Sequence, residues 1–251
     1  MMVDYGVRAR IGVATPQANP TVEPELHALF PEGVALYSTR LVHPAADVET
    51  RLDHYIRHLP QAIATFGSLR LAAFGLGCTG SSYRVSPAFE DALTAGAAAE
   101  RGLPVITAAQ AVRSALAALG LRRIALVSPY PEKLAEAGYR YWEAAGIEIV
   151  ARLRVDPALV DTHGIYEMTS HDALASLRRL DCRDAEVVLL SGTGMPTLRA
   201  LRLATAETSL PLISSNLCLA WALLRSVSPT LAPATPQALL RAAQPATTDS
   251  I

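Results

Sequence analysis

Short apolar runs alternate with amphipathic stretches along most of the chain. The amphipathic stretches carry apolar residues at helical spacing, as Leu52, Ile56 and Leu59 do within residues 46–66. The apolar runs end at Gly, Pro or Ser, which is typical of buried strands. This alternation predicts an α/β fold with mainly parallel sheets. The expected strands are 10–15, 34–41, 69–77, 105–107, 123–127, 147–155, 186–190 and 212–214, and the expected helices are 24–30, 46–66, 88–101, 109–119, 132–145, 169–180, 196–208 and 217–227.

Three blocks of the first half recur in the same order in the second half. The alternative is that any two strand–helix units look alike, and it stays open. The repeat predicts two pseudo-symmetric, Rossmann-like (flavodoxin-like) lobes whose strand ends face one inter-lobe cleft. The matching blocks are 10–17 with 123–130, 76–80 with 190–194, and 103–110 with 210–217.

The repeat also indicates where each lobe begins and ends. We expect residues 1–113 to form the first lobe, joined by the helix over 217–227, and residues 114–216 to form the second. Residues 228–251 are rich in Pro, Ala and Thr, and they predict a mobile tail with one short helix near 236–243.

Composition narrows the class of protein. With 51% hydrophobic and 18% charged residues, the chain of 251 residues can bury a sizeable core. The net charge of −1 offers no footprint for nucleic acid. The single Lys, Lys133, disfavours Schiff-base or pyridoxal chemistry, which needs a reactive Lys. No apolar run reaches the roughly 18 residues of a membrane helix, and the first residues lack a signal-peptide pattern.

The cysteines and histidines show no metal-binding pattern. Cys78, Cys182 and Cys218 are an odd number without ligand spacing, so a reduced, cytoplasmic protein is the simplest expectation. His54 and His58 are one helical turn apart, but without a third ligand nearby a solvated helix face is favoured over a metal site. We therefore expect no metal, no cofactor, no nucleic acid and no membrane as partners.

The apolar run over 69–77 places Cys78 at the carboxyl end of a predicted buried strand. Open α/β sheets bind ligands at that edge. The small residues after Cys78 could point backbone N–H groups at an anion and lower the pKa of the thiol. The alternative for Cys78 is a small buried hydrophobe. We take Cys78 as the candidate for the chemistry, with Cys182 structural and Cys218 in the core.

Gly192, Thr193 and Gly194 occupy the matching place in the second lobe, so only one side of the expected cleft carries a thiol. Thr193 is a candidate anion donor, or part of a simple strand-to-helix turn. A Gly-x-Gly-x-x-Gly pattern over 75–80 formally matches the dinucleotide fingerprint. It follows the third predicted strand, and the next strand ends without an acidic residue. The glycines therefore favour close approach of a carboxylate over nucleotide binding.

Four motifs occur in a fixed order along the chain, at residues 15–25, 78–82, 128–130 and 214–216. Together they resemble the aspartate/glutamate racemase superfamily, nearest its maleate cis–trans isomerase and arylmalonate decarboxylase branch. The resemblance covers most of residues 8–227. Isomerases and racemases of this family carry a second Cys where this chain has Gly192. That departure disfavours racemisation by two facing thiols.

The resemblance implies roles for particular residues. Cys78 would attack an olefinic carbon or act as acid or base, Asn19 would hold a carboxylate, and Tyr130 would hydrogen-bond a carboxylate or enediolate oxygen. The alternatives are an Asx turn for Asn19 and a packing role for Tyr130. Cys78 and Tyr130 are thus the expected catalytic residues. The expected substrate-binding residues are Asn19, Thr79, Gly80, Ser81, Gly192, Thr193, Gly194 and, from a loop that caps the cleft, His163.

Three functions follow, all on a small carboxylate or dicarboxylate. The favoured one is maleate-isomerase-like cis–trans isomerisation by Cys78. The second is a cofactor-free decarboxylase in which Cys78 protonates one face, which would give the product enantiomer opposite to that from a second-lobe thiol. The third is a non-catalytic carboxylate-binding protein. Arg84 is a candidate for holding a second carboxylate, and family analogy implies a homo-oligomer.

Overall fold

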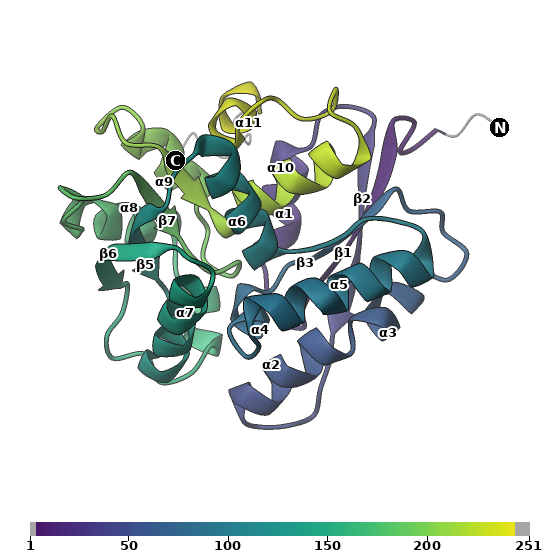
Figure 1. Ribbon diagram of the computed structural model, residues 1–251, viewed down its shortest axis with the longest axis horizontal. Helices are drawn as coiled ribbons and strands as arrows, with labels where there is room; N and C mark the ends of the chain where they lie inside the picture. Colours follow the sequence, from purple (N-terminus) through teal and green to yellow (C-terminus); the bar gives the residue numbers. More distant parts are fainter. Residues whose placement is uncertain (1–3, 244–251) are drawn as a thin grey trace.

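The computed structural model describes residues 4–243 as two lobes, each built on a four-stranded parallel sheet (Figure 1). The first sheet has the order β2-β1-β3-β4 and the second the order β6-β5-β7-β8. The predicted α/β class with two pseudo-symmetric lobes is confirmed. The strands are β1 (Ala9–Pro16), β2 (Val34–Leu41), β3 (Ala73–Leu76), β4 (Val105–Thr107), β5 (Arg123–Ser128), β6 (Glu148–Arg154), β7 (Val187–Leu190) and β8 (Leu212–Ser214).

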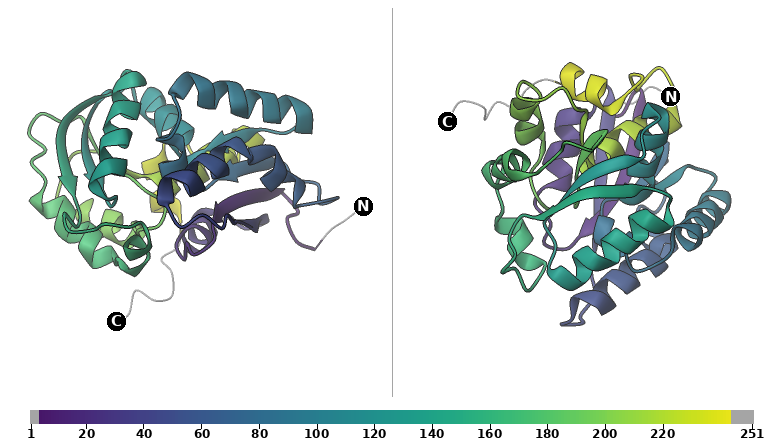
Figure 2. Two further views of the ribbon diagram at one scale, coloured as in Figure 1. Left: turned by 90° about the horizontal axis from the view of Figure 1, so that it is seen from below. Right: turned by 60° about the vertical axis from the view of Figure 1, so that its left-hand side comes forward.

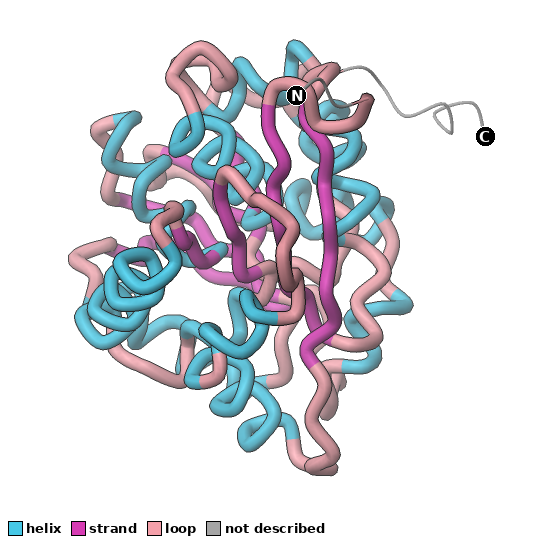
Figure 3. Tube along the Cα trace, turned by 90° about the vertical axis from the view of Figure 1, so that its right-hand side faces the viewer, coloured by secondary structure: helices cyan, strands magenta, loops and turns pink. Residues whose placement is uncertain are grey.

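Helices lie on both sides of the strands, which are magenta in Figure 3. No helix within residues 4–243 is long and apolar enough to cross a membrane. The helices are α1 (Val22–Leu29), α2 (Val48–Arg57), α3 (Leu59–Ala64), α4 (Thr79–Ser82), α5 (Pro87–Arg101), α6 (Ala108–Leu119), α7 (Glu132–Ala144), the 3-10 helix η1 (His163–Glu167), α8 (Ser170–Arg179), α9 (Leu198–Ala204), α10 (Ser215–Val227) and α11 (Pro236–Ala242).

The order of the strands creates one crevice in each lobe. In the first sheet the chain moves from β1 to one side and then returns to the other side of β1 at β3. The loops after β1 and β3 therefore leave the sheet in opposite directions, which opens a crevice at their carboxyl ends. The loops after β5 and β7 do the same in the second sheet. The left view of Figure 2 shows the two lobes side by side.

Helix α10 follows the second sheet but packs against β3, β4 and α6 of the first. Close packing is possible because β3 contains Gly75, where a Cβ would lie 2.9 Å from Leu223 Cδ1 of α10. The division of the lobes at residues 113 and 114 stays a prediction.

Three predicted elements are shorter or divided in the structure, and one of them is the helix expected over 196–208, which spans only Leu198–Ala204. The helix expected over 46–66 is two helices, because α2 ends at Arg57 and α3 begins with Pro60 in its first turn. Proline has no N–H to donate back into a preceding helix. The strand expected over 69–77 pairs only over Ala73–Leu76, and Leu71 instead covers Gly12 of β1.

The described part of the Pro-rich segment packs against the body of the protein. Leu231 and Leu239 are buried, and Trp221 Nε1 donates to the Pro233 carbonyl at 2.9 Å. Helix α11 lies where the sequence predicts a short helix. Residues 244–251 lie outside the described residues, and the mobility of the segment stays a prediction.

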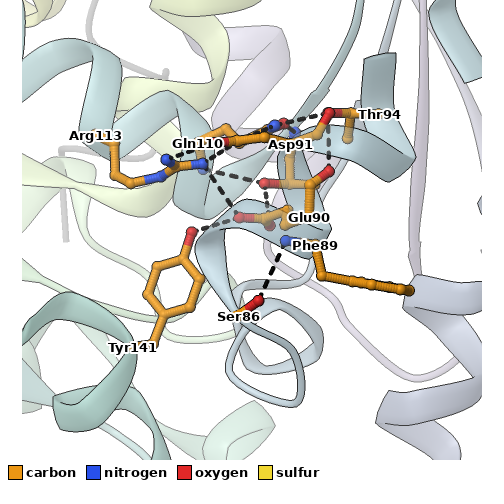
Figure 4. A network of polar contacts seen from close by, with 9 residues as sticks. Ser86, Phe89, Glu90, Asp91, Thr94, Gln110, Arg113 and Tyr141 are labelled. Carbon is orange, nitrogen blue, oxygen red and sulfur yellow. Dashed lines mark hydrogen bonds and ion pairs between the residues drawn. The ribbon is translucent and has the colours of Figure 1, made fainter. Parts of the chain in front are cut away.

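A buried polar network around Glu90 joins the two lobes (Figure 4). The Glu90 carboxylate accepts hydrogen bonds from the hydroxyls of Thr107 (2.6 Å) and Tyr141, and it lies 3.5 Å from the Arg113 guanidinium. Tyr141 belongs to α7, which packs against β6, whereas Glu90 and Arg113 belong to α5 and α6. A buried carboxylate needs such partners, so the network holds α7 to α5 and α6.

Candidate active site

A cavity of about 230 Å³ lies where the carboxyl ends of β1, β3, β5 and β7 come together. Its wall includes residues from the segments that follow all four strands, and both lobes therefore contribute. Helix α2 and the helix η1 complete the wall. Of the predicted site residues, the lining includes Asn19, Cys78, Gly80, Tyr130, His163, Thr193 and Gly194.

Cys78 is 4% exposed and stands directly before the first residue of α4. The Ser81 hydroxyl donates a hydrogen bond to Cys78 Sγ at 3.0 Å. Burial raises the pKa of the Cys78 thiol, while hydrogen bonds from the Ser81 hydroxyl and from the backbone N–H groups of Ser81 and Gly80 lower it. Burial therefore favours the protonated thiol, and these donors are in place to stabilise a thiolate.

Three tyrosines line the cavity with Cys78: Tyr55, Tyr130 and Tyr166. Burial raises the pKa of all three phenols, that of Tyr130 well above its usual value. All three are therefore neutral hydrogen-bond donors. Tyr130 Oη lies 3.5 Å from the point where a Cβ on Gly80 would stand, an ordinary van der Waals distance, so the hydroxyl lies beside the segment that follows the thiol.

Asn19 combines the two roles that its sequence context allows. Its Oδ1 accepts hydrogen bonds from the N–H groups of Thr21 (2.8 Å) and Val22 (3.2 Å), as in an Asx turn. Its Nδ2 donates to Thr193 Oγ1 across the lobe boundary at 3.4 Å. Since Asn19 also lines the cavity, its second N–H is available to an anion there.

Thr193 and Gly194 bring the second lobe to the cavity wall. The Thr193 hydroxyl donates to the Gly77 carbonyl at 2.9 Å, so its proton is already used. At Gly194 a Cβ would lie 2.9 Å from Tyr166 Cε1, which explains a glycine there. Thr193 therefore supports the wall and the Asn19 amide, rather than offering its hydroxyl proton to an anion.

Thr79, Ser81 and Gly192 are buried beside the cavity but are not part of its lining. Ser81 acts on the Cys78 sulfur instead. Gly192 has a φ of +87°, and a Cβ there would lie 2.7 Å from Pro129 Cγ. A Cβ there would also lie 3.4 Å from Tyr130 Oη, so Gly192 is next to a lining residue. The position of Gly192 across the cleft from the thiol, and a substrate contact for these three residues, stay predictions.

Two histidines line the cavity from different loops. His163 is exposed and its Nδ1 lies 2.9 Å from Asp161 Oδ1. His43 Nδ1 accepts a hydrogen bond from the Ala45 N–H at 3.2 Å, and the His43 ring lies 4.3 Å from that of His54. No group of His, Cys, Asp and Glu within residues 4–243 is arranged to hold a metal ion.

Sequence reasoning missed Arg51, Tyr55 and Tyr166. Arg51 and Tyr55 are one turn apart on α2, and that spacing was the available signal. The cationic candidate that the sequence suggests, Arg84, instead pairs with Glu49 and Asp53, each at 3.3 Å. Arg84 is not part of the lining, so the cation at the cavity is Arg51.

Two facing parallel sheets with one buried thiol between their switch points define a two-lobed α/β protein of the Asp/Glu racemase-like superfamily. A family model described as arylmalonate decarboxylase matches residues 11–240, and the chain belongs to this family.

The relatives of the chain include two kinds of enzyme. It is 28% identical over 244 residues to the maleate isomerase of Nocardia farcinica, covering 88% of this chain and 91% of the relative. It is 29% identical over 225 residues to the arylmalonate decarboxylase of Bordetella bronchiseptica, covering 82% and 85%.

Solved structures show the same relationship. The N. farcinica maleate cis-trans isomerase, a Cys-to-Ser mutant with a covalently bound succinylcysteine intermediate, superposes with a TM-score of 0.80 at 25% identity. That match covers 94% of this chain and 99% of the other. Unliganded arylmalonate decarboxylase superposes with a TM-score of 0.67 at 23% identity over 88% and 93% of the two chains, which is a likeness of fold.

Proposed function

We propose that this protein is a cofactor-independent cis–trans isomerase that acts on a maleate-like cis-enedioate through Cys78. One observation carries the proposal: the buried Cys78 sulfur lies in a cavity whose wall supplies hydrogen-bond donors from both lobes. Support comes from the maleate isomerases among the relatives, one of which was solved with a covalent succinylcysteine.

The proposed reaction begins with addition of the Cys78 sulfur to one olefinic carbon. A C–S bond forms and the π electrons move onto the neighbouring carboxylate, which becomes an enediolate. The former double bond is then single and rotates. The electrons return, the double bond forms again in the trans geometry, and the C–S bond breaks. Because the same sulfur adds and leaves, the scheme needs no second thiol at Gly192.

Other lining residues have defined tasks in this scheme. The Ser81 hydroxyl and the N–H groups of Gly80 and Ser81 stabilise the thiolate. The Asn19 amide and the Tyr130 hydroxyl hydrogen-bond the carboxylate that becomes the enediolate, where donors fixed in advance are most effective. The thiol proton must leave before addition, and a substrate carboxylate can receive it and return it when the thiolate leaves.

The test is incubation with maleate, with fumarate followed by NMR. Cys78→Ala is expected to abolish fumarate formation, and Cys182→Ala, which changes a thiol outside the cavity lining, is the matched control. Unchanged turnover by Cys78→Ala would refute the proposal.

A second candidate is a cofactor-free decarboxylase for malonate-type acids. It is favoured by burial, which raises the pKa of Cys78 and keeps the thiol protonated. After loss of CO₂, Cys78 would donate its proton to one face of the enediolate. An arylmalonate with chiral analysis of the product tests it. Turnover of neither acid combined with tight carboxylate binding would indicate a binding protein.

We also infer a homo-oligomer in the cytoplasm. The three cysteines are free, as expected in a reducing compartment, and the family analogy supports an oligomer. Light scattering after size exclusion tests the oligomeric state, and a single species of 26.7 kDa would contradict it.

A further inference from the structure

We propose that Arg51 binds the second carboxylate of the substrate and thereby selects dicarboxylates over monocarboxylates. The role of Arg51 rests on the proposed function, because that function identifies the substrate as an acid with a reacting double bond. The motifs of the sequence do not indicate this specificity role.

Arg51 is held in place by the loop that precedes its own helix. Its Nη1 donates hydrogen bonds to the carbonyl groups of Ala45, at 3.0 Å, and Ala46. Both carbonyls belong to the segment between β2 and α2. The guanidinium is therefore oriented before any ligand binds, and less side-chain entropy is lost on binding.

Arg51 forms no ion pair within residues 4–243. The exposed Asp47 carboxylate lies within its electrostatic reach without pairing with it, since the Thr50 hydrogen bonds lower the pKa of Asp47 most and Arg51 lowers it only slightly. Among the described residues, Arg51 is also the only Arg or Lys in the cavity lining. A planar guanidinium with free donors binds a carboxylate through two parallel hydrogen bonds.

The same cavity is lined by Arg51, Tyr55, Cys78 and Tyr166. In agreement with that, burial raises the pKa of both tyrosines most, the Cys78 sulfur raises it further, and Arg51 lowers it. The guanidinium and the thiol can therefore contact the same bound molecule.

The size of the cavity limits what can lie between the two groups. Its volume of about 230 Å³ is below the roughly 300 Å³ at which pockets for drug-sized ligands begin. A short acid fits, with one carboxylate at Asn19 and Tyr130 and the other at Arg51. A malonate bearing a bulky aryl group needs more room than a short acid, and the size of the cavity therefore disfavours it.

The experiment compares a dicarboxylate with its monoamide, which has nearly the same shape and one charge fewer. Succinate and succinamate carry no double bond, so calorimetry measures their binding without turnover. We expect the wild type to bind succinate about tenfold more tightly than succinamate, and Arg51→Gln to remove most of that difference, since a charged hydrogen-bonded pair is worth roughly one factor of ten. Arg51→Lys keeps the positive charge but loses the planar pair of N–H donors, so it should retain part of the preference for succinate.

Arg57→Gln is the matched control, because Arg57 lies on the same helix, is exposed and packs over the Phe89 ring outside the cavity. It should retain the preference for succinate. Equal weakening of both ligands by Arg51→Gln, an unchanged preference, or no binding of either acid by the wild type would each overturn the inference.

Maleate and maleamate, followed by NMR, separate this inference from the proposed function. A preference for succinate that Arg51→Gln removes, without any isomerisation of maleate, refutes the proposed reaction and leaves the role of Arg51 standing. Isomerisation of maleate with an unchanged preference in Arg51→Gln refutes the role of Arg51 alone.

Discussion

Gly192 occupies the position of the second lobe that matches Cys78 in the first. The substitution Gly192→Ala tests whether the backbone conformation at this position requires glycine. Gly192 has a φ of +87°, in the left-handed region that favours glycine. A Cβ there would also lie 2.7 Å from Pro129 Cγ and 3.4 Å from Tyr130 Oη. Proline is rigid, so the contact with Pro129 is relieved only by moving the backbone.

The expected loss of stability is the sum of these two effects. A non-glycine residue in the left-handed region costs about 1–2 kcal/mol. Forcing an extra carbon into a packed site costs about 1–3 kcal/mol. Gly192→Ala should therefore lower the free energy of unfolding by roughly 2–5 kcal/mol. Gly192→Cys carries both penalties and adds a larger side chain.

Urea denaturation followed by fluorescence of the buried Trp142 and Trp221 measures the effect. Gly96→Ala is the matched control, because Gly96 lies inside α5 with nothing within 4 Å of its would-be Cβ. That change should stabilise the protein by about 0.5–1 kcal/mol. A Gly192→Ala variant within about 0.5 kcal/mol of the wild type, or a stable Gly192→Cys variant that racemises a chiral acid, would refute the reasoning.

Two further predictions concern groups buried near the cavity and between the lobes. Because burial raises the pKa of Cys78 above the 9.0 of an ordinary thiol, its alkylation by iodoacetamide should accelerate only above that pH, and Ser81→Ala should move the midpoint higher. Peptide mass mapping checks this, and a midpoint below 9.0 would contradict it. Tyr141→Phe removes a donor from the buried carboxylate of Glu90 and should lower the free energy of unfolding by about 1–3 kcal/mol in urea denaturation; no change would contradict the network.

The repeat in the sequence predicts two similar lobes, because its matching blocks form matching strands. Residues 10–17 and 123–130 become β1 and β5, which occupy the same place in two sheets of the same order. Cys78 follows a strand of the first sheet and Tyr130 a strand of the second, and they line one cavity because the carboxyl ends of both sheets face it. For Cys78 and Tyr130, a position directly after a predicted strand was enough to predict a place in the site.

The other side of the cavity could not be predicted in this way. Arg51, Tyr55 and Tyr166 come from α2 and η1, whose placement depends on how helices pack over the strand ends. In the sequence, Tyr55 has the spacing of an apolar residue on an amphipathic helix. That spacing predicts a core residue and gives no sign that Tyr55 lines the site. Thr79, Ser81 and Gly192 follow the expected strands and are buried, but they are not among the lining residues of the cavity. Their contact with a substrate stays a prediction.

Within residues 4–243, the cavity lining holds one thiol, that of Cys78. Racemisation by two facing thiols needs a second one opposite it, and Cys182 and Cys218 do not line the cavity. The Tyr130 hydroxyl cannot replace a thiol there, because burial raises its pKa far above neutrality. Two kinds of reaction need no second thiol. In one, Cys78 adds to the substrate and leaves again; in the other, Cys78 gives one proton to the substrate. Isomerisation is of the first kind and one-sided protonation of the second. Because maleate-like and malonate-type acids both carry two carboxylates, the proposed Arg51 contact does not separate these two reactions.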